Sequence, residues 1–268
     1  MRRTVSVSLL SLALAVPSVA IASRDAVKEV KKTVPLSADG VLELKTFKGT
    51  ITVATAARRD VEIQARIEAD GSDEDQAAKV EATKVRIKGS GASVSVESDY
   101  EDAKGLRLFS WFGHDNVLPF VHYTISMPEG ARLRIDDYKG TIRVEGVTGG
   151  VDLTTYKGSV NAKGLKGAAR LNTYKGDIRV AFDSFEDGGD VETYKGKVEL
   201  RVPKTARFDL DADTGRRGDF RSDFDLGSSV SRTSSRRGRD ERVRGAVNGG
   251  GPRLRMSTYK GTLLVREN

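Results

Sequence analysis

The sequence predicts an all-β protein, a β-solenoid (β-helix) of short strands in repeats of ~18–20 residues, with an irregular β-rich cap before them. Three observations carry the prediction. A short motif recurs at near-constant spacing, apolar residues keep alternating offsets around it, and every copy contains a glycine. An antiparallel β-sandwich remains the alternative, because evenly spaced short strands also suit hairpins.

The motif is an aromatic residue, a lysine and a glycine. Its central glycines, Gly140, Gly158, Gly176 and Gly196, follow one another at intervals of 18, 18 and 20 residues. A repeat of this length cannot bury its own apolar face, so neighbouring repeats must stack and share one core. The copies are Phe47-Lys48-Gly49, Tyr138-Lys139-Gly140, Tyr156-Lys157-Gly158, Tyr174-Lys175-Gly176, Tyr194-Lys195-Gly196 and Tyr259-Lys260-Gly261.

Apolar residues flank each glycine at the same offsets and alternate with polar ones. Leu153 and Val160 surround one copy, and Leu171 and Ile178 surround the next. This period of two indicates strands with one buried face on each side of the motif.

Each position of the motif has an expected role. The glycine lies where the chain turns a corner, and we expect it to need a positive φ. The preceding threonine falls on the buried side, where its hydroxyl can bond to the backbone of the corner. Tyrosine falls on the opposite side, so tyrosines of successive repeats should stack near the surface. The threonines are Thr155, Thr173, Thr193 and Thr258.

The lysines are harder to explain by packing. Two like charges ~5 Å apart in water repel by roughly 0.8 kcal/mol, so solvent or nearby carboxylates such as Asp136 or Asp177 must intervene. Either the lysine is an exposed residue copied with the corner, or the strip binds an anionic glycan or envelope polymer. The candidate ligand-binding residues are Tyr138, Lys139, Tyr156, Lys157, Tyr174, Lys175, Tyr194 and Lys195.

Residues 1–22 have the pattern of a cleaved export signal. Arg2 and Arg3 precede an apolar run at residues 5–16, and Ala20-Ile21-Ala22 has the form of a signal-peptidase site. We expect Sec-type export, with the protein periplasmic, at the cell surface or secreted. No later segment reaches the ~20 apolar residues of a membrane span, so none is expected in the mature chain. The absence of cysteine excludes disulfides, thiolate metal sites and cysteine nucleophiles.

Residues 23–127 are predicted to form a β-rich section that caps the solenoid of residues 128–268. Ser72-Asp73-Glu74-Asp75 opens a polar segment that resembles a short capped helix, ending near Lys84. A cap is needed because the terminal coil of a solenoid would otherwise expose a sheet edge.

Large aromatic residues gather between Tyr100 and Val121. Phe109, Trp111 and Phe112 could plug one end of the core or present a surface to a membrane-protein partner, and both readings stay open. His114 and His122 are too few ligands for a metal ion, so no metal site is predicted.

Residues 215–252 are predicted to be a flexible basic loop, because arginines are set there among serines and glycines. With 45 Lys and Arg against 38 Asp and Glu, the chain carries a net charge of +7. We expect no nucleic-acid partner for an exported protein, so anionic lipid or glycan is the expected target of such a surplus.

The residues from Leu133 to Tyr194, with the approach Gly249-Gly250-Gly251-Pro252-Arg253-Leu254, resemble the bacterial "putative adhesin" family of unknown function. Its members repeat a Thr-x-Asn-Gly corner; here lysine stands in place of the asparagine, as in Thr155-Tyr156-Lys157-Gly158. The chain also resembles the head domains of auto-transporter-like adhesins. The resemblance implies a β-solenoid of the cell envelope with no established enzymatic activity.

The sequence therefore predicts a non-catalytic, exported, adhesin-like binding or scaffold protein of the cell envelope, with no catalytic or cofactor-binding residues. One alternative is an envelope-stress or regulatory accessory that contacts a membrane partner. The other is a polysaccharide-active β-helix enzyme. Asp136 and Asp137 make a poor acid and base pair for that chemistry, because adjacent strand residues point to opposite faces.

Overall fold

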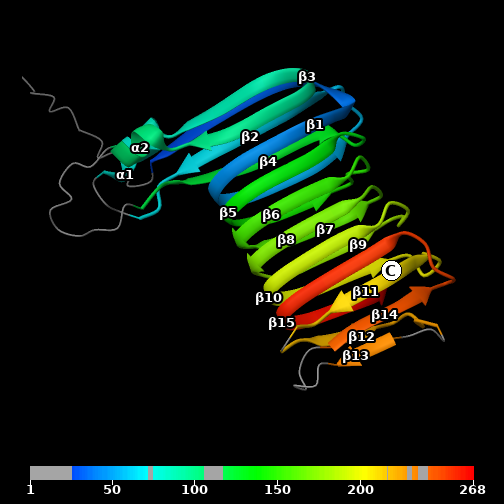
Figure 1. Ribbon diagram of the computed structural model, residues 1–268. Coiled ribbons are helices and arrows are strands. Elements are labelled where there is room, and N and C mark those ends of the chain that lie inside the picture. Colours follow the sequence, from blue (N-terminus) through cyan, green and yellow to red (C-terminus); the bar gives the residue numbers. More distant parts are fainter. Residues whose placement is uncertain (1–25, 72–74, 106–116, 216, 228–230, 235–240) are drawn as a thin grey trace, which may run out of the picture.

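The structure is a computed structural model that describes residues 26–71, 75–105, 117–215, 217–227, 231–234 and 241–268 (Figure 1). In these ranges the strands form one fifteen-stranded sheet, and two short helices lie beside its N-terminal strands. The helices are α1 (Gln76–Ala82) and α2 (Glu101–Gly105). The strands are β1 (Val27–Ala56), β2 (Asp60–Glu68), β3 (Lys84–Asp99), β4 (Phe120–Pro128), β5 (Arg132–Glu145), β6 (Val151–Lys157), β7 (Ser159–Leu165), β8 (Ala169–Lys175), β9 (Ile178–Phe182), β10 (Gly189–Val202), β11 (Phe208–Asp213), β12 (Asp219–Ser222), β13 (Ser231–Ser234), β14 (Glu241–Val247) and β15 (Arg253–Glu267).

Successive repeats pair in parallel and in register. Leu153 of β6 lies opposite Leu171 of β8, and Lys157 lies opposite Lys175. The last repeat follows the same rule, because Lys195 of β10 lies opposite Lys260 of β15. Equivalent residues are therefore one strand spacing apart, ~4.8 Å, and form columns across the sheet.

The predicted β-solenoid is wrong, because the paired strands close into a barrel. β5 and β10 run unbroken through the corner glycines Gly140 and Gly196. As a result β5 pairs with both β6 and β7, and β10 pairs with both β8 and β9. Since β6 also pairs with β8, and β7 with β9, the six parallel strands form a closed ring in the order β5-β6-β8-β10-β9-β7, to which further strands are added. The repeat spacing determines only the register between neighbouring strands. That register is the same in an open solenoid and in a closed barrel.

The core consists of the apolar residues whose alternation marked the repeats. Leu153, Leu171 and Val191 are completely buried on one side of the ring, and Ile178 and Val198 on the other. Each strand exposes every second side chain, so the polar residues between them lie on the outer face of the sheet.

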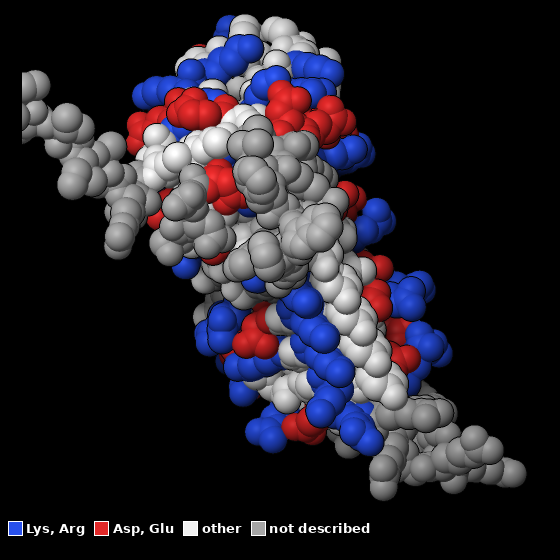
Figure 2. All heavy atoms as spheres, turned by 90° about the vertical axis from the view of Figure 1, so that its left-hand side faces the viewer, with Lys and Arg blue, Asp and Glu red and all other residues white. Residues whose placement is uncertain are grey.

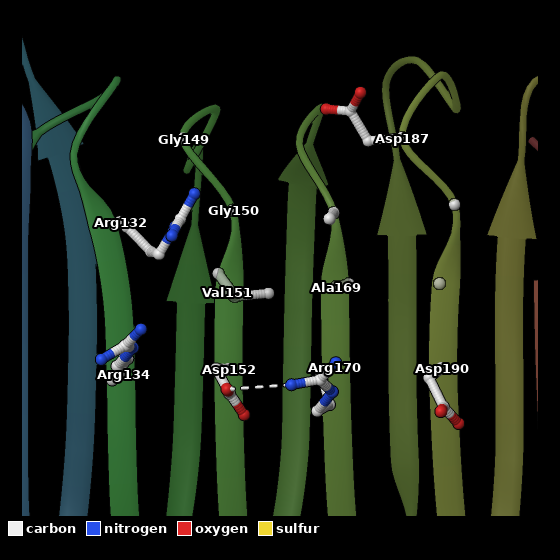
Figure 3. A pocket seen from close by; sticks show the side chains of 13 residues that line it. Arg132, Arg134, Gly149, Gly150, Val151, Asp152, Ala169, Arg170, Asp187 and Asp190 are labelled. Atoms are coloured by element: carbon white, nitrogen blue, oxygen red, sulfur yellow. Dashed lines mark ion pairs between the residues drawn. The ribbon is translucent and has the colours of Figure 1, made fainter. Parts of the chain in front are cut away.

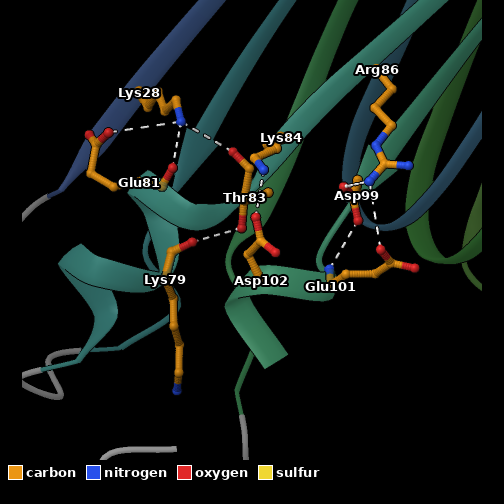
Figure 4. Close-up of polar contacts among 9 residues, drawn as sticks. All are labelled: Lys28, Lys79, Glu81, Thr83, Lys84, Arg86, Asp99, Glu101 and Asp102. Atoms are coloured by element: carbon orange, nitrogen blue, oxygen red, sulfur yellow. Dashed lines mark hydrogen bonds and ion pairs between the residues drawn. The ribbon is translucent and has the colours of Figure 1, made fainter. Parts of the chain in front are cut away.

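The N-terminal strands cover one end of the barrel (Figure 1). β1 continues the parallel sheet beside β5 and also pairs antiparallel with β2. Polar contacts tie the helices to these strands (Figure 4): Lys28 Nζ of β1 donates to the Glu81 carbonyl at 2.6 Å, and Lys84 Nζ of β3 pairs with Asp102 Oδ2 at 2.5 Å. α1 begins at Gln76, within the segment predicted to be helical.

Residues 215–252, predicted to be a flexible loop, contain β12, β13 and β14. β14 pairs antiparallel with β11, and its Val243 is completely buried. Arg242 of β14 pairs with Asp211 of β11 at 2.6 Å, so this arginine is held within the sheet. Among the described helices, neither is long and apolar enough to cross a membrane.

Candidate functional site

Six aromatic rings form one continuous stack along the outside of the sheet. Their centroids are 4.7–5.1 Å apart, and neighbouring planes are within 13° of parallel. Such offset stacking contributes ~0.5–1.5 kcal/mol per pair. The predicted stacking of the tyrosines is therefore confirmed. We call these rings the aromatic stack: Phe47, Tyr138, Tyr156, Tyr174, Tyr194 and Tyr259.

A row of exposed lysines runs beside the stack. Figure 2 shows basic side chains as an unbroken blue column next to a column of uncharged ones. The Nζ atoms of Lys157, Lys175 and Lys195 lie 5.5–5.6 Å from the centroid of the preceding tyrosine ring. In the described part of the chain no carboxylate forms an ion pair with this lysine column, which consists of Lys139, Lys157, Lys175, Lys195 and Lys260.

Lys48, the first lysine of the motif series, differs from the others. Its side chain is buried, pairs with Asp70 Oδ2 at 2.5 Å and lies over the Phe120 ring, 4.5 Å from its centroid. The N-terminal section thus neutralises the charge of Lys48, and the exposed lysine column begins at Lys139.

Another column on the same outer face has alternating charges. Along it Asp152 and Asp190 each lie opposite an arginine on both neighbouring strands, and Glu43 lies opposite Arg134 on one side. Two of these contacts are ion pairs, Arg134 with Glu43 at 3.0 Å and Arg170 with Asp152 at 3.6 Å. The alternating column consists of Glu43, Arg134, Asp152, Arg170, Asp190 and Arg255.

The corner glycines are required by close backbone contact. A Cβ at Gly158 would lie 1.8 Å from the Gly140 carbonyl oxygen, and one at Gly176 would lie 1.8 Å from that of Gly158. Positive φ is not the shared reason that we predicted, because Gly140 and Gly158 do not adopt it. Any side chain at these positions would push neighbouring strands apart and misalign the columns.

The threonines of the motif are buried, as predicted. Thr173 Oγ1 donates to the Gly158 carbonyl at 3.3 Å, and Thr193 Oγ1 donates to that of Gly176 at 3.1 Å. These bonds join one corner to the next.

Asp137 takes the threonine position in the copy that meets the N-terminal section. It is 3% exposed and accepts a bond of 2.8 Å from Thr155 Oγ1. Burial raises the pKa of this carboxyl to about 6, and the bond from Thr155 offsets part of that rise. Its neighbour Asp136 is exposed, so the two carboxyls point to opposite faces, as expected from the strand period.

The stack leaves only part of each tyrosine available to a ligand. In Tyr138, Tyr156 and Tyr174 both ring faces contact neighbouring rings, yet the residues remain 37–43% exposed. Exposure is therefore at the ring edges, which carry the hydroxyl groups. A sugar ring cannot lie flat on these rings, so the stack acts as a rigid spacer with a hydroxyl edge.

A trough of about 370 Å³ follows the other side of the stack. The rings of Tyr138, Tyr156 and Tyr174 form one wall, and the exposed side chains of Thr154 and Asn172 line it. The aromatic stack thus separates the trough from the lysine column.

A second groove, of about 520 Å³, lies where β5, β6, β8 and β10 begin (Figure 3). It is lined by glycines and by charges of both signs, including Arg132, Arg170 and Asp187. Arg170 is already paired with Asp152. The groove therefore offers no excess of either charge to a ligand.

The candidate partner-binding residues Phe109, Trp111 and Phe112 lie outside the described residues, as does His114. His122 is on β4, where its Nδ1 accepts a bond of 3.2 Å from the Thr50 backbone and burial lowers its pKa. Within the described ranges, no three His, Asp or Glu side chains are grouped to hold a metal ion.

The sequence pointed to the lysine column and the aromatic stack but missed two neighbouring features. The trough could have been found from Thr154 and Asn172, which are uncharged at the position that Asp136 and Glu192 occupy two residues before Tyr138 and Tyr194. The buried carboxyl of Asp137 was visible as the one acidic residue in the threonine series.

Solved structures of other proteins are similar to the chain at low identity. A "putative cell adhesion protein" from Clostridium sporogenes is 10% identical, with a TM-score of 0.47, and the match covers 90% of this chain and 100% of that one. A "putative adhesin" from Bacteroides fragilis is 13% identical, with a TM-score of 0.28 and coverage of 90% and 97%. A "putative lipid binding protein" from Parabacteroides distasonis is 9% identical, with a TM-score of 0.30 and coverage of 90% and 96%. Nothing about function follows from likenesses this distant.

No curated protein matches the sequence. The family model described as Toastrack DUF4097 matches residues 23–248, which span most of the chain, from the N-terminal section through the barrel to β14. The chain therefore belongs to the Toastrack DUF4097 family.

Proposed function

We propose that the protein is a non-catalytic, adhesin-like binding protein of the cell envelope, whose lysine column binds a linear anionic polymer. The observation that carries the proposal is a row of five exposed lysines in register, without a carboxylate partner in the described structure.

The like-charge repulsion along this row is not offset by ion pairs in the described structure. Neighbouring ammonium groups one strand spacing apart repel by roughly 0.8 kcal/mol per pair in water before screening. Asp177, one of the carboxylates expected to compensate, pairs instead with Arg179. An anionic polymer along the column would neutralise several lysines at once, so its contacts would add up over its length.

The two alternative functions have less support. The enzyme reading needs convergent carboxylates, and Asp136 and Asp137 lie on opposite faces. The accessory reading depends on Phe109, Trp111 and Phe112, which lie outside the described residues.

Export to the periplasm, the cell surface or the medium is part of the proposal and rests on the sequence of residues 1–22. A polymer of the envelope is the anionic chain that an exported protein would meet there. A membrane-protein partner is not required by the lysine column.

The test is binding of polygalacturonate, a linear chain with one carboxylate per sugar, to the purified protein. Affinity should fall as salt is added, because lysine and carboxylate charges are screened. Lys157→Gln with Lys175→Gln should weaken binding and flatten the salt dependence. Lys163→Gln is the matched control, because Lys163 is exposed on β7 but already paired with Glu145 at 3.0 Å. Equal effects of the control and the double variant would contradict the proposal.

A further inference from the structure

We infer that the ligand of the lysine column is an anionic polysaccharide, which lies along the edge of the aromatic stack with its hydroxyl groups in the trough. This inference rests on the proposed function and names the class of polymer. It follows from three parallel strips on the outer face, the lysine column, the aromatic stack and the trough, which share one strand spacing.

The trough offers groups that a sugar needs and a bare polyanion does not. Asn172 has an amide that donates and accepts, and Thr154 has a hydroxyl that does both. In the described structure neither side chain has a hydrogen-bond partner. Hydrogen bonds to sugar hydroxyls would therefore displace water without breaking a bond within the protein.

Asp136 favours a polysaccharide over a polyanion that has no hydroxyl groups. It lies opposite Thr154, lines the same trough and has no ion pair in the described ranges. A carboxylate only accepts hydrogen bonds. Lys45 of β1 lies opposite Asp136 and lines the same trough, so the trough has one charge of each sign and no excess of positive charge for a polyphosphate or polyacrylate chain, whereas Asp136 can accept a bond from a sugar hydroxyl.

The arrangement also requires a polymer with two different sides. Anionic groups must reach the lysines on one side of the stack, and hydroxyls must reach Thr154 and Asn172 on the other. The exposed hydroxyl edges of Tyr156 and Tyr174 lie between them, and in the described structure these hydroxyls have no partner. A polysaccharide with one acidic group on each sugar meets this requirement along its whole length.

The experiment compares two ligands with the same number of carboxylates, an oligogalacturonate and a polyacrylate that has no hydroxyls. Thr154→Val with Asn172→Leu keeps the side-chain size and removes the hydrogen-bonding groups. We expect about a tenfold loss of affinity for the oligogalacturonate, equivalent to about 1.4 kcal/mol, because hydrogen bonds from two side chains are lost. Affinity for polyacrylate should be unchanged.

Asn161→Leu is the control, because Asn161 is exposed on β7 of the barrel but does not line the trough. It should leave both affinities unchanged, and thermal unfolding should confirm that every variant is folded. An equal loss for both ligands, or no loss for the oligogalacturonate, would overturn the inference and leave the proposed function standing. Failure of the lysine variants to weaken either ligand would instead overturn the proposed function.

Discussion

Two columns of charged residues on one outer face are built in opposite ways. In the alternating column neighbouring residues have opposite charges, as Asp152 faces Arg134 and Arg170. In the lysine column every residue faces its own kind, as Lys175 faces Lys157 and Lys195. Both columns arise from the same repeats and the same register, so duplication of the repeat does not explain the difference.

The alternating column stabilises the sheet, whereas the lysine column does not. Opposite charges directly across a sheet contribute roughly 0.2–1 kcal/mol per pair, and like charges there are destabilising. The alternating column therefore follows the rule that stabilises sheets, and the lysine column violates it. A violation repeated on five strands indicates that the lysines serve something outside the fold.

The largest expected effect is at the corner that aligns both columns. In Gly158→Val the new side chain would meet the Gly140 carbonyl, so strands β5 and β7 must separate. We expect the free energy of unfolding to fall by at least about 3 kcal/mol. Lys157→Ala, at the adjacent exposed position, should change it by less than about 0.5 kcal/mol. Equal losses in denaturant unfolding would show that the glycine does not set the strand spacing.

The next effect concerns the buried column of threonines beneath the corner. The pKa of Asp137 is about 6 in the folded protein, above its value of about 4 in an unfolded chain. As pH rises from about 4 to 6, the unfolded chain loses this proton first, so wild-type stability should fall across that window.

Asp137→Thr, which installs the residue of the other copies, should remove that loss. The variant should be more stable than the wild type at neutral pH by up to about 3 kcal/mol. The gain should shrink towards acid pH and disappear below about pH 4. Chemical unfolding at several pH values measures this, and a gain that is independent of pH would mean that packing rather than charge is responsible.

Charge reversal should have opposite signs in the two columns. Arg170→Glu puts a third acidic residue between Asp152 and Asp190 and should destabilise the protein by roughly 0.2–1 kcal/mol at low salt. Lys175→Glu, on the same strand β8, creates two opposite-charge neighbours and should stabilise it by a similar amount. If both reversals destabilise equally, the lysine column is a structural element.

The smallest effect is expected at the aromatic stack. Tyr174→Phe keeps the stacked ring, so the free energy of unfolding should change by less than about 0.5 kcal/mol. Tyr174→Ala removes two stacked contacts and should cost more. A large loss in the phenylalanine variant, measured by thermal unfolding, would assign the hydroxyl a structural role.

Much of the repeat architecture could be read from the sequence because period-two alternation has a direct physical cause. Leu153 and Leu171 had to face the core, and Tyr156 and Tyr174 had to lie on the opposite face. Closure of the barrel could not be predicted. Closure depends on β5 and β10 continuing through Gly140 and Gly196. A glycine at a corner allows either a bend or a straight strand, so the sequence does not distinguish the two.

Charge was the other source of error. The arginines of residues 241–247 favoured a flexible loop, yet Val243 alternates with Arg242 and Arg244 as in any strand with one buried face. Lys48 matched the other lysines in its motif, and its buried environment is formed by distant residues, Asp70, 22 residues away, and Phe120. Such pairings between distant residues leave no local signal in the sequence.

The most direct test of the central claim measures folding and binding on one variant, Lys157→Gln with Lys175→Gln. We expect the free energy of unfolding to stay the same or rise slightly, because like-charge repulsion is removed. We also expect the affinity for polygalacturonate at low salt to fall well below that of the Lys163→Gln control. A loss of stability with unchanged affinity would contradict the claim and show that the lysine column serves the fold.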